Sequence, residues 1–157
     1  MRILVLWATC LVVAFTMTTT SMALEDDFDV RVAVARTEEM RDRVVRANIE
    51  LTTEEADKFW PLYAEYREKL GPVSRDQIKV VVEYSTVHTN LSDAKATSLF
   101  DQWLSLRKKE SKIKSRYHKK FRKLLSPKRA IRYIQIENKL DAAIEWDAAL
   151  SIPLVQP

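Results

Sequence analysis

The chain has 157 residues, one glycine, one cysteine and a formal net charge of +4. A single cysteine excludes an intramolecular disulfide, and a single glycine argues against sheets joined by tight turns, which need positive φ angles. Scarce Gly and Pro beside abundant Ala, Leu, Glu, Lys and Arg favour an all-α fold, and the length suits one domain with a moderate core.

Residues 1–23 have the pattern of a cleaved secretory signal. Arg2 supplies a positive charge, residues 3–15 are almost entirely apolar, and small residues precede a cleavage site after Ala23. The apolar run is shorter than the roughly 20 residues that a membrane-spanning helix needs, which makes an uncleaved anchor the weaker interpretation. The only cysteine lies inside this run, a poor context for lipidation. We therefore expect an exported, periplasmic protein with a single, cysteine-free helical domain over residues 24–157.

A first helix is expected over residues 29–47, after the acidic leader at residues 25–27. The apolar positions of this segment recur only loosely at helical spacing, so we expect its start to be frayed. These positions are Val32, Ala35, Met40, Val44 and Ala47.

The second helix is expected to begin at Thr52. The Thr52 hydroxyl is a good N-cap, and Glu55 lies three residues later, which completes a capping box. Pro61 should bend this helix, and Gly71 with Pro72 should end or kink it. The apolar face, at spacings of three and four residues, consists of Ala56, Phe59, Trp60, Tyr63, Tyr66 and Leu70.

Residues 73–88 are expected to form a third helix. The three consecutive valines at 80–82 are β-branched and also compatible with a strand. No partner strand is visible elsewhere in the sequence, so the helix is favoured. The side chains expected to face inward are Ile78, Val81, Val82 and Ser85.

A long helix is expected from residue 92 to residue 125, with Ser92 as its N-cap. Its inward residues recur at spacings of three and four, like a coiled-coil seam. At 1.5 Å per residue the helix would be about 50 Å long, more than a compact domain of this size requires, which indicates an elongated hairpin or a dimer. The inward residues are Ala96, Leu99, Trp103, Leu106, Glu110, Ile113, Tyr117, Phe121 and Leu124.

The last helix is expected over residues 126–150, with Ser126 as its N-cap and Pro127 at its first position. Pro153 ends it, and the short apolar tail at residues 152–155 should dock on the domain. The inward face of this helix consists of Ala130, Tyr133, Glu137, Leu140, Ile144 and Ala148.

The basic residues gather in one segment. Residues 107–132 contain thirteen Lys or Arg and one acid, Glu110, a net charge of +12. The rest of the chain after residue 23 has 12 basic and 21 acidic residues, a net charge of −9. Such segregation exceeds what solubility requires, and a face of one sign repels itself unless acids lie nearby. The cations that we expect to bind a client or partner are Arg107, Lys108, Lys112, Lys114, Arg116, Lys119, Lys120 and Lys123.

Three interpretations of this basic segment stay open. Its cations could contact acids of the last helix, at Glu137, Asp141, Glu145 and Asp147, within one chain or across a dimer. They could form a surface for acidic or unfolded proteins, or for anionic lipid headgroups. Nucleic acid would also suit the charge, but an exported protein rarely meets it, so we expect no nucleic-acid partner.

The sequence contains no catalytic motif and no metal-ligating cluster. His88 and His118 have no carboxylate or thiol at ligand spacing, and there is no glycine-rich phosphate loop, HExxH motif or nucleophile elbow. Glu110 and Glu137 fall on or near apolar stripes, and we expect each to pair with Arg or Lys and to fix the register of the helices. We expect no enzyme activity and no cofactor.

Two segments resemble a known motif. Residues 51–55 (LTTEE) and 125–129 (LSPKR) resemble the paired LTxxQ motifs of the Spy/CpxP family of periplasmic stress proteins. Residues 59–63 (FWPLY), 132–137 (RYIQIE) and 152–154 (IPL) resemble a short, divergent branch of that family. The resemblance implies four to five helices that form long bent hairpins, paired into an elongated curved homodimer. It also implies ATP-independent binding of unfolded clients, or modulation of an envelope stress sensor.

Both motifs open a helix with a leucine that packs and a hydroxyl residue that caps. Neither motif ends in Gln, because Glu55 and Arg129 occupy the last positions. The expected helix-opening and capping residues are Leu51, Thr52, Glu55, Leu125 and Ser126.

The sequence thus predicts a periplasmic chaperone-like protein of the envelope stress response, which captures unfolded or acidic clients on a basic helix. The alternatives are a regulatory adaptor that docks on a kinase sensor domain or an anti-sigma factor, and a peripheral membrane or cell-wall binder. Apolar contacts to the client are expected at Phe59, Trp60, Tyr63, Trp103 and Trp146.

Overall fold

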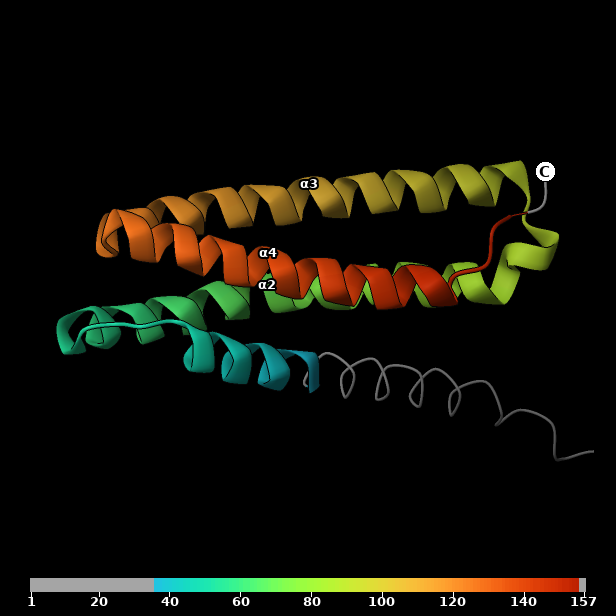
Figure 1. Ribbon diagram of the computed structural model, residues 1–157. Helices are drawn as coiled ribbons and strands as arrows, with labels where there is room; N and C mark the ends of the chain where they lie inside the picture. Colours follow the sequence, from blue (N-terminus) through green and yellow to red (C-terminus); the bar gives the residue numbers. More distant parts are fainter. Residues whose placement is uncertain (1–35, 156–157) are drawn as a thin grey trace, which may run out of the picture.

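The computed structural model describes residues 36–155 as helices joined by short turns (Figure 1). Residues 36–48 are helical and are followed by α2 (Thr53–Val87), the 3-10 helix η1 (His88–Asn90), α3 (Asp93–Leu124) and α4 (Pro127–Ser151). No strand occurs among the residues that the structure describes, so the all-α prediction is confirmed. The expected signal at residues 1–23 and the start of the first expected helix, residues 29–35, lie outside the described residues.

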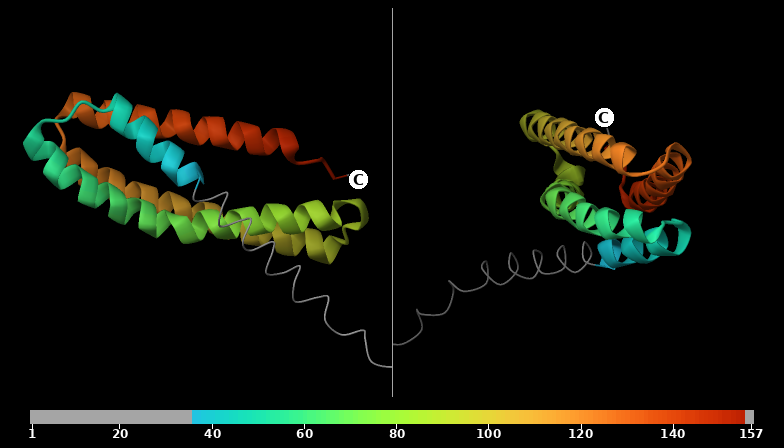
Figure 2. Two further views of the ribbon diagram at one scale, coloured as in Figure 1. Left: turned by 90° about the horizontal axis from the view of Figure 1, so that it is seen from below. Right: turned by 90° about the vertical axis from the view of Figure 1, so that its left-hand side faces the viewer.

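The helices form an elongated antiparallel bundle (Figures 1 and 2). α2 and α3 run close together and are joined by η1 at one end, which we call the η1 end. The turns before α2 and before α4 both lie at the opposite end, which we call the junction end. Along the described chain, α4 approaches α3 over a short stretch, and its backbone stays more than 8 Å from α2. The long hairpins expected from the sequence are therefore present.

α2 is one continuous helix, so of the two predicted outcomes at Gly71 and Pro72, an end or a kink, the end is wrong. Pro61 and Pro72 are both exposed, so the carbonyl groups that lose an N–H partner there can be hydrated. Leu70 and Val73, on either side of the Gly-Pro pair, are buried, and their packing holds the two halves of the helix in line. Figure 2 shows the bend that the prolines introduce along α2.

The three valines at 80–82 are part of α2, so they are not a strand. The inward face of this part of α2 also differs from the prediction, because Val73 and Val80 are buried whereas Val82 and Ser85 are exposed. The reason is that α2 is continuous. Its buried side chains after Pro72 therefore follow the same 3.6-residue periodicity as those before it.

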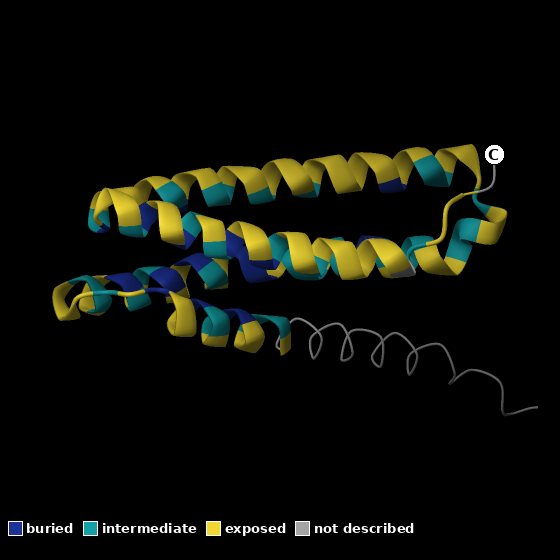
Figure 3. Cartoon of the chain, in the orientation of Figure 1, coloured by how far each residue is buried: buried dark blue, intermediate teal, exposed yellow. Residues whose placement is uncertain are grey.

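The hydrophobic core lies in the half of the bundle near the junction end (Figure 3). Aromatic rings from three helices meet there. The ring centroid of Phe121 in α3 lies 4.5 Å from that of Tyr133 in α4 and 5.2 Å from that of Phe59 in α2. Tyr66 adds a ring 5.9 Å from Phe121. Because large aromatic side chains bury the most apolar surface, this cluster is a main source of hydrophobic stabilisation.

The predicted seam on α3 is buried only in part. Leu99, Tyr117 and Phe121 are buried, while the other six seam residues are half-buried or exposed. On α4 the predicted face is buried as far as Leu140, but Ala148 is exposed. The separation of α4 from α2 explains the difference, because a stripe of apolar residues is buried only where a neighbouring helix covers it.

The two motif-like openings meet at the junction end. The capping box is confirmed: the Glu55 N–H donates to Thr52 Oγ1 (3.2 Å), and the Thr52 N–H donates to a Glu55 carboxylate oxygen (3.0 Å). The same carboxylate accepts the Ser126 N–H (3.3 Å) and forms an ion pair with Arg129 (3.1 Å). The two residues that stand at the last motif positions therefore pair with each other and tie the start of α2 to the start of α4.

Ser126 occupies the N-cap position of α4, but its hydroxyl makes no capping hydrogen bond, so its predicted capping role is wrong. Pro127 follows it and has no N–H, and the Ser126 N–H is already bonded to Glu55. The leucines behave as expected, because Leu125 is buried and Leu51 packs against the core.

Replacing Thr52 with alanine should lower the free energy of unfolding by about 1 kcal/mol, because it removes the side-chain acceptor of the capping box. Ser126→Ala is the matched control and should change the free energy of unfolding by less than about 0.5 kcal/mol, because no capping bond is lost. Urea denaturation of both variants measures the two values. Equal losses in the two variants would contradict the assignment of the caps.

Candidate binding surface on α3

α3 carries its cations on the sides that point away from the core. Tyr117 and Phe121 face the bundle, and the outer side of the helix is exposed in Figure 3. Five of the eight predicted cations are exposed and make no ion pair with any other residue in 36–155. These five residues, which we call the open basic face, are Lys108, Lys112, Arg116, Lys119 and Lys123.

The other three predicted cations are paired with acids of neighbouring helices. The pairs are Arg107 with Glu145 (2.7 Å) and Lys114 with Asp141 (2.8 Å), both to α4, and Lys120 with Glu65 (3.3 Å), to α2. The acidic last helix therefore covers one side of α3, and the outer side stays open. The contact with α4 accounts for only two of the eight cations.

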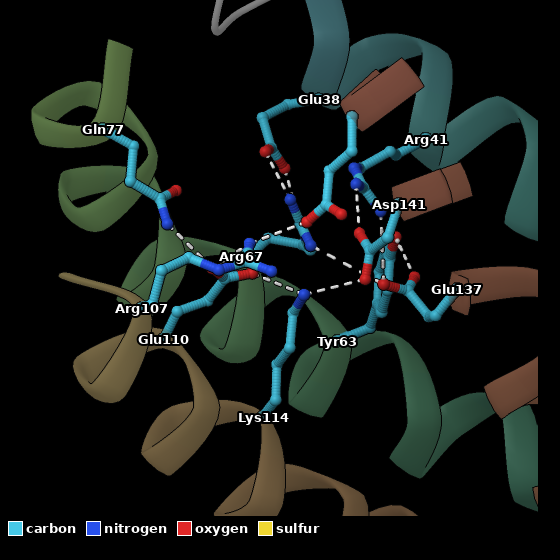
Figure 4. Close-up of polar contacts among 11 residues, drawn as sticks. Glu38, Arg41, Tyr63, Arg67, Gln77, Arg107, Glu110, Lys114, Glu137 and Asp141 are labelled. Carbon is cyan, nitrogen blue, oxygen red and sulfur yellow. Dashed lines mark hydrogen bonds and ion pairs between the residues drawn. The ribbon is translucent and has the colours of Figure 1, made fainter. Parts of the chain in front are cut away.

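Charged and polar side chains from all four helices form an interior charge network (Figure 4). Its members are Glu38, Arg41, Tyr63, Arg67, Gln77, Arg107, Glu110, Lys114, Glu137, Asp141 and Glu145. The prediction that Glu110 and Glu137 pair with cations is confirmed. Arg41 and Arg67 complete the network and are absent from the sequence-based prediction. The only signal for Arg67 is its place one turn after Tyr63, beside the apolar face of its helix.

Glu137 is the buried centre of the network, with 1% of its surface exposed. Its carboxylate accepts hydrogen bonds from the Tyr63 hydroxyl (3.1 Å) and from Arg41 (3.5 Å), and lies 3.7 Å from Arg67. Arg41 also donates to Asp141, one turn along α4. Two guanidinium groups thus compensate the charge that α4 brings into the core, and they come from residues 36–48 and from α2.

Glu110 and Lys114 extend the network on α3. The Gln77 amide of α2 donates to Glu110 (2.8 Å), and the Lys114 ammonium lies 2.5 Å from Glu110 and donates to Asp141 (2.8 Å). Asp141 is therefore shared by a cation from α3 and a cation from residues 36–48. The network holds the middle of α4 against the other helices, where few apolar side chains of α4 pack.

The environment shifts the pKa values of Glu137 and Asp141, both in α4, in opposite directions. Burial raises the pKa of Glu137 above its ordinary value, although the charges of Arg67 and Arg41 act against it. Burial would also raise the pKa of Asp141, but the hydrogen bond from Lys114 and the charge of Arg41 outweigh it and hold that pKa below its ordinary value. Because each of these carboxylates has a cationic partner, the role that we assign to the network is to hold the helices together through ion pairs.

The predicted apolar contact residues divide into two groups. Phe59 and Tyr63 lie in the core, at 0% and 3% exposure, so they offer no surface to a client. Trp60 is half-buried, with an arginine guanidinium 3.9 Å above its ring. Trp103 is 37% exposed and Trp146 is 66% exposed. An apolar stripe marks the side of a helix that packs against its neighbours. Of the predicted contact residues, Trp103 and Trp146 are the exposed ones, because they lie away from the core at the junction end.

An apolar cavity of about 320 Å³ lies at the η1 end, between α2, α3 and the C-terminal tail. Three exposed side chains line it: Phe100, Trp103 and Val155. The expected docking of the tail is present, because the Tyr84 hydroxyl donates to the Pro153 carbonyl (2.7 Å). One exposed apolar surface of the described residues therefore lies at the η1 end, away from the aromatic core.

Within residues 36–155, no group of three or more His, Cys, Asp or Glu side chains is placed to hold a metal ion. None of the described helices combines the length and the apolar character that crossing a membrane requires. Comparisons of the chain with protein-family models, with curated proteins and with solved structures found no match.

Proposed function

We propose that this protein is a periplasmic, ATP-independent chaperone-like binding protein that captures unfolded or acidic clients on the open basic face of α3. The observation that carries the proposal is the row of exposed cations that have no acidic partner among the described residues. Such a face repels itself, and its cost in stability is offset when an acidic partner binds. The resemblance of residues 51–55 and 125–129 to LTxxQ motifs supports the same class of function.

Charge and apolar surface would act at different stages. Long-range attraction to the open basic face speeds the encounter with an acidic client and weakens as salt is added. Exposed apolar side chains at the η1 end, including Phe100 and Trp103, would then hold unfolded segments. The proposal includes a homodimer, which the resemblance implies.

The test is suppression of aggregation by purified protein that lacks residues 1–23. A urea-denatured acidic client is diluted into buffer, and light scattering is recorded with a several-fold molar excess of protein. We expect suppression at about 0.05 M salt and clear weakening at about 0.5 M salt, because the Debye length falls with ionic strength. The absence of suppression at either salt concentration would contradict the proposal.

A pair of matched variants locates the activity. Lys112→Glu with Lys123→Glu reverses two charges of the open basic face, and Lys69→Glu with Lys139→Glu reverses two exposed charges elsewhere. Both variants have the same net charge, so only the position differs. The first should require several-fold more protein for equal suppression, whereas the second should match the unmodified protein. Equal losses would show that net charge, and not α3, determines capture.

The alternatives give different results in the same preparation. An adaptor for an envelope stress sensor would crosslink to one specific partner and show little general suppression of aggregation. A membrane or cell-wall binder would co-sediment with anionic liposomes or sacculi.

A further inference from the structure

A groove of about 780 Å³ runs between α3 and α4, and only residues of these two helices line it. The two helices lie on one side of the bundle, with α2 and residues 36–48 on the other, as the end-on view in Figure 2 shows. The floor of the groove is apolar. Phe121 and Ala130 are buried beneath it, Ile134 is half-buried, and Ile131 is 62% exposed. An exposed isoleucine above a buried floor is surface that another apolar side chain could cover.

The α3 side of the groove is cationic. Arg107, Lys114, Lys119 and Arg122 line it, and the only acid in the lining, Glu110, is already bonded within the interior charge network. Lys119 and Arg122 are exposed and form no ion pair with any described residue. Arg107 and Lys114 are already paired with Glu145 and Asp141 of α4, so Lys119 and Arg122 are the cations of the lining that a partner could meet.

We propose that this groove binds an amphipathic helix of a partner protein that has acidic residues along one flank. The apolar face of that helix would cover Ile131 and Ile134, and its acidic flank would lie against Lys119 and Arg122. The inference rests on the proposed function, for which it names the preferred client segment and the place where that segment binds.

The backbone groups of the lining residues favour a bound helix over a bound extended peptide. Every lining residue belongs to α3 or α4, so their N–H and C=O groups are already used inside those helices. An extended peptide would find no backbone partner on the apolar floor and would leave its own groups unpaired. A helix satisfies its backbone internally and needs only side-chain contacts, as in other helix-in-groove complexes.

The spacing of the cations decides between a helix and a single-headed lipid. A fatty acid carries one anionic group at one end of an apolar chain. The groove instead has two separate unpaired cations, Lys119 and Arg122, which lie three residues apart and match two acidic residues one turn apart on a helix. Charge complementarity therefore favours the acidic flank of an amphipathic helix.

The probe is a fluorescein-labelled peptide of about 18 residues, which is about 27 Å long as a helix. It is built from Leu, Ala and Glu, with leucines on one face and glutamates on the adjoining flank. A scrambled peptide of the same composition lacks the amphipathic pattern, and sodium oleate is the lipid control. Fluorescence anisotropy with the purified protein at about 0.15 M salt, where distant charges are screened, measures the dissociation constants.

Two groove variants and two matched controls locate the binding. Lys119→Glu with Arg122→Glu reverses two groove charges, and Lys69→Glu with Lys139→Glu reverses two exposed charges outside the groove. Ile131→Glu places a charge in the groove, and Leu104→Glu puts the same charge on another exposed apolar residue, 51% exposed and outside the groove. Each groove variant should weaken peptide binding at least about tenfold, and each control by no more than about threefold. Circular dichroism confirms that all four variants are folded.

The outcomes separate this inference from the proposed function. Tighter binding of the patterned peptide than of the scrambled one, lost in the groove variants only, supports the groove. Equal losses in the groove and control variants, equal binding of both peptides, or binding of oleate without the peptide would overturn it. Aggregation of the urea-denatured client is measured with the same variants. If suppression of aggregation persists while peptide binding fails these criteria, the groove inference falls and the proposed function stands.

Discussion

Replacing Arg41 with methionine should lower the free energy of unfolding by about 3–5 kcal/mol, the range for breaking a buried ion pair by removing one partner. The Arg41 guanidinium lies between Glu137 and Asp141, with its side chain 7% exposed. Methionine keeps much of the apolar stem but removes both charge contacts. Glu137 would then keep only Arg67, at 3.7 Å, as a cationic neighbour. The cost comes from the carboxylate left in the core with less compensation.

Arg43→Met is the matched control for this prediction. Arg43 lies on the same helix, is exposed and makes no contact with another described charged residue, so the same substitution should cost no more than about 0.5 kcal/mol. Urea denaturation followed by circular dichroism gives both values. A loss below about 1 kcal/mol at Arg41 would show that the interior charge network does not hold α4 in place.

Replacing Phe121 with alanine should destabilise the protein by about 3–5 kcal/mol, as is typical of Phe to Ala changes in a core. Phe121 is 1% exposed and contacts the rings of Phe59, Tyr66 and Tyr133, so it joins three helices at the junction end. Its removal would leave a cavity where these rings meet. Among residues 36–155, few side chains at the η1 end are buried, so no second large core there takes over this role.

Phe100→Ala tests the same substitution on the same helix. Phe100 is 62% exposed, so its replacement should change the free energy of unfolding by less than about 1 kcal/mol. The two thermal or urea transitions are compared directly. Similar losses at Phe121 and Phe100 would mean that the stability of α3 is spread along its length instead of concentrated at the junction end.

The helix boundaries could be predicted from the sequence because their determinants are local. The capping box at Thr52 and Glu55, the cap at Ser92 and Pro127 at the first position of α4 act over three or four residues, and the structure has helices that begin there. The predicted end at Gly71 was wrong for the same reason. Helix-breaking residues act locally, but the burial of side chains on either side of them kept α2 continuous.

The candidate surface was predictable in its charge but not in its exposure. Composition places thirteen cations in one segment, and helical spacing puts them around an apolar seam. Spacing alone could not separate Lys114, which is bonded to Asp141, from Lys112, which is exposed two residues earlier. It also could not place Tyr63 in the core and leave Trp146 exposed, because that depends on which helix covers each face.

The sequence by itself determined that this chain forms long helices, since hydrogen bonds between near neighbours and the periodicity of apolar residues specify them. It also determined the segregation of charge, because thirteen basic residues are gathered in residues 107–132. Only the tertiary structure decided which charges meet. Glu55 and Arg129 are 74 residues apart, and Arg41 and Asp141 are 100 residues apart, so their contacts depend on the packing of separate helices. Because α4 covers one side of α3 only, cations that are alike in the sequence are ion-paired with α4 on one side and form an open basic face on the other.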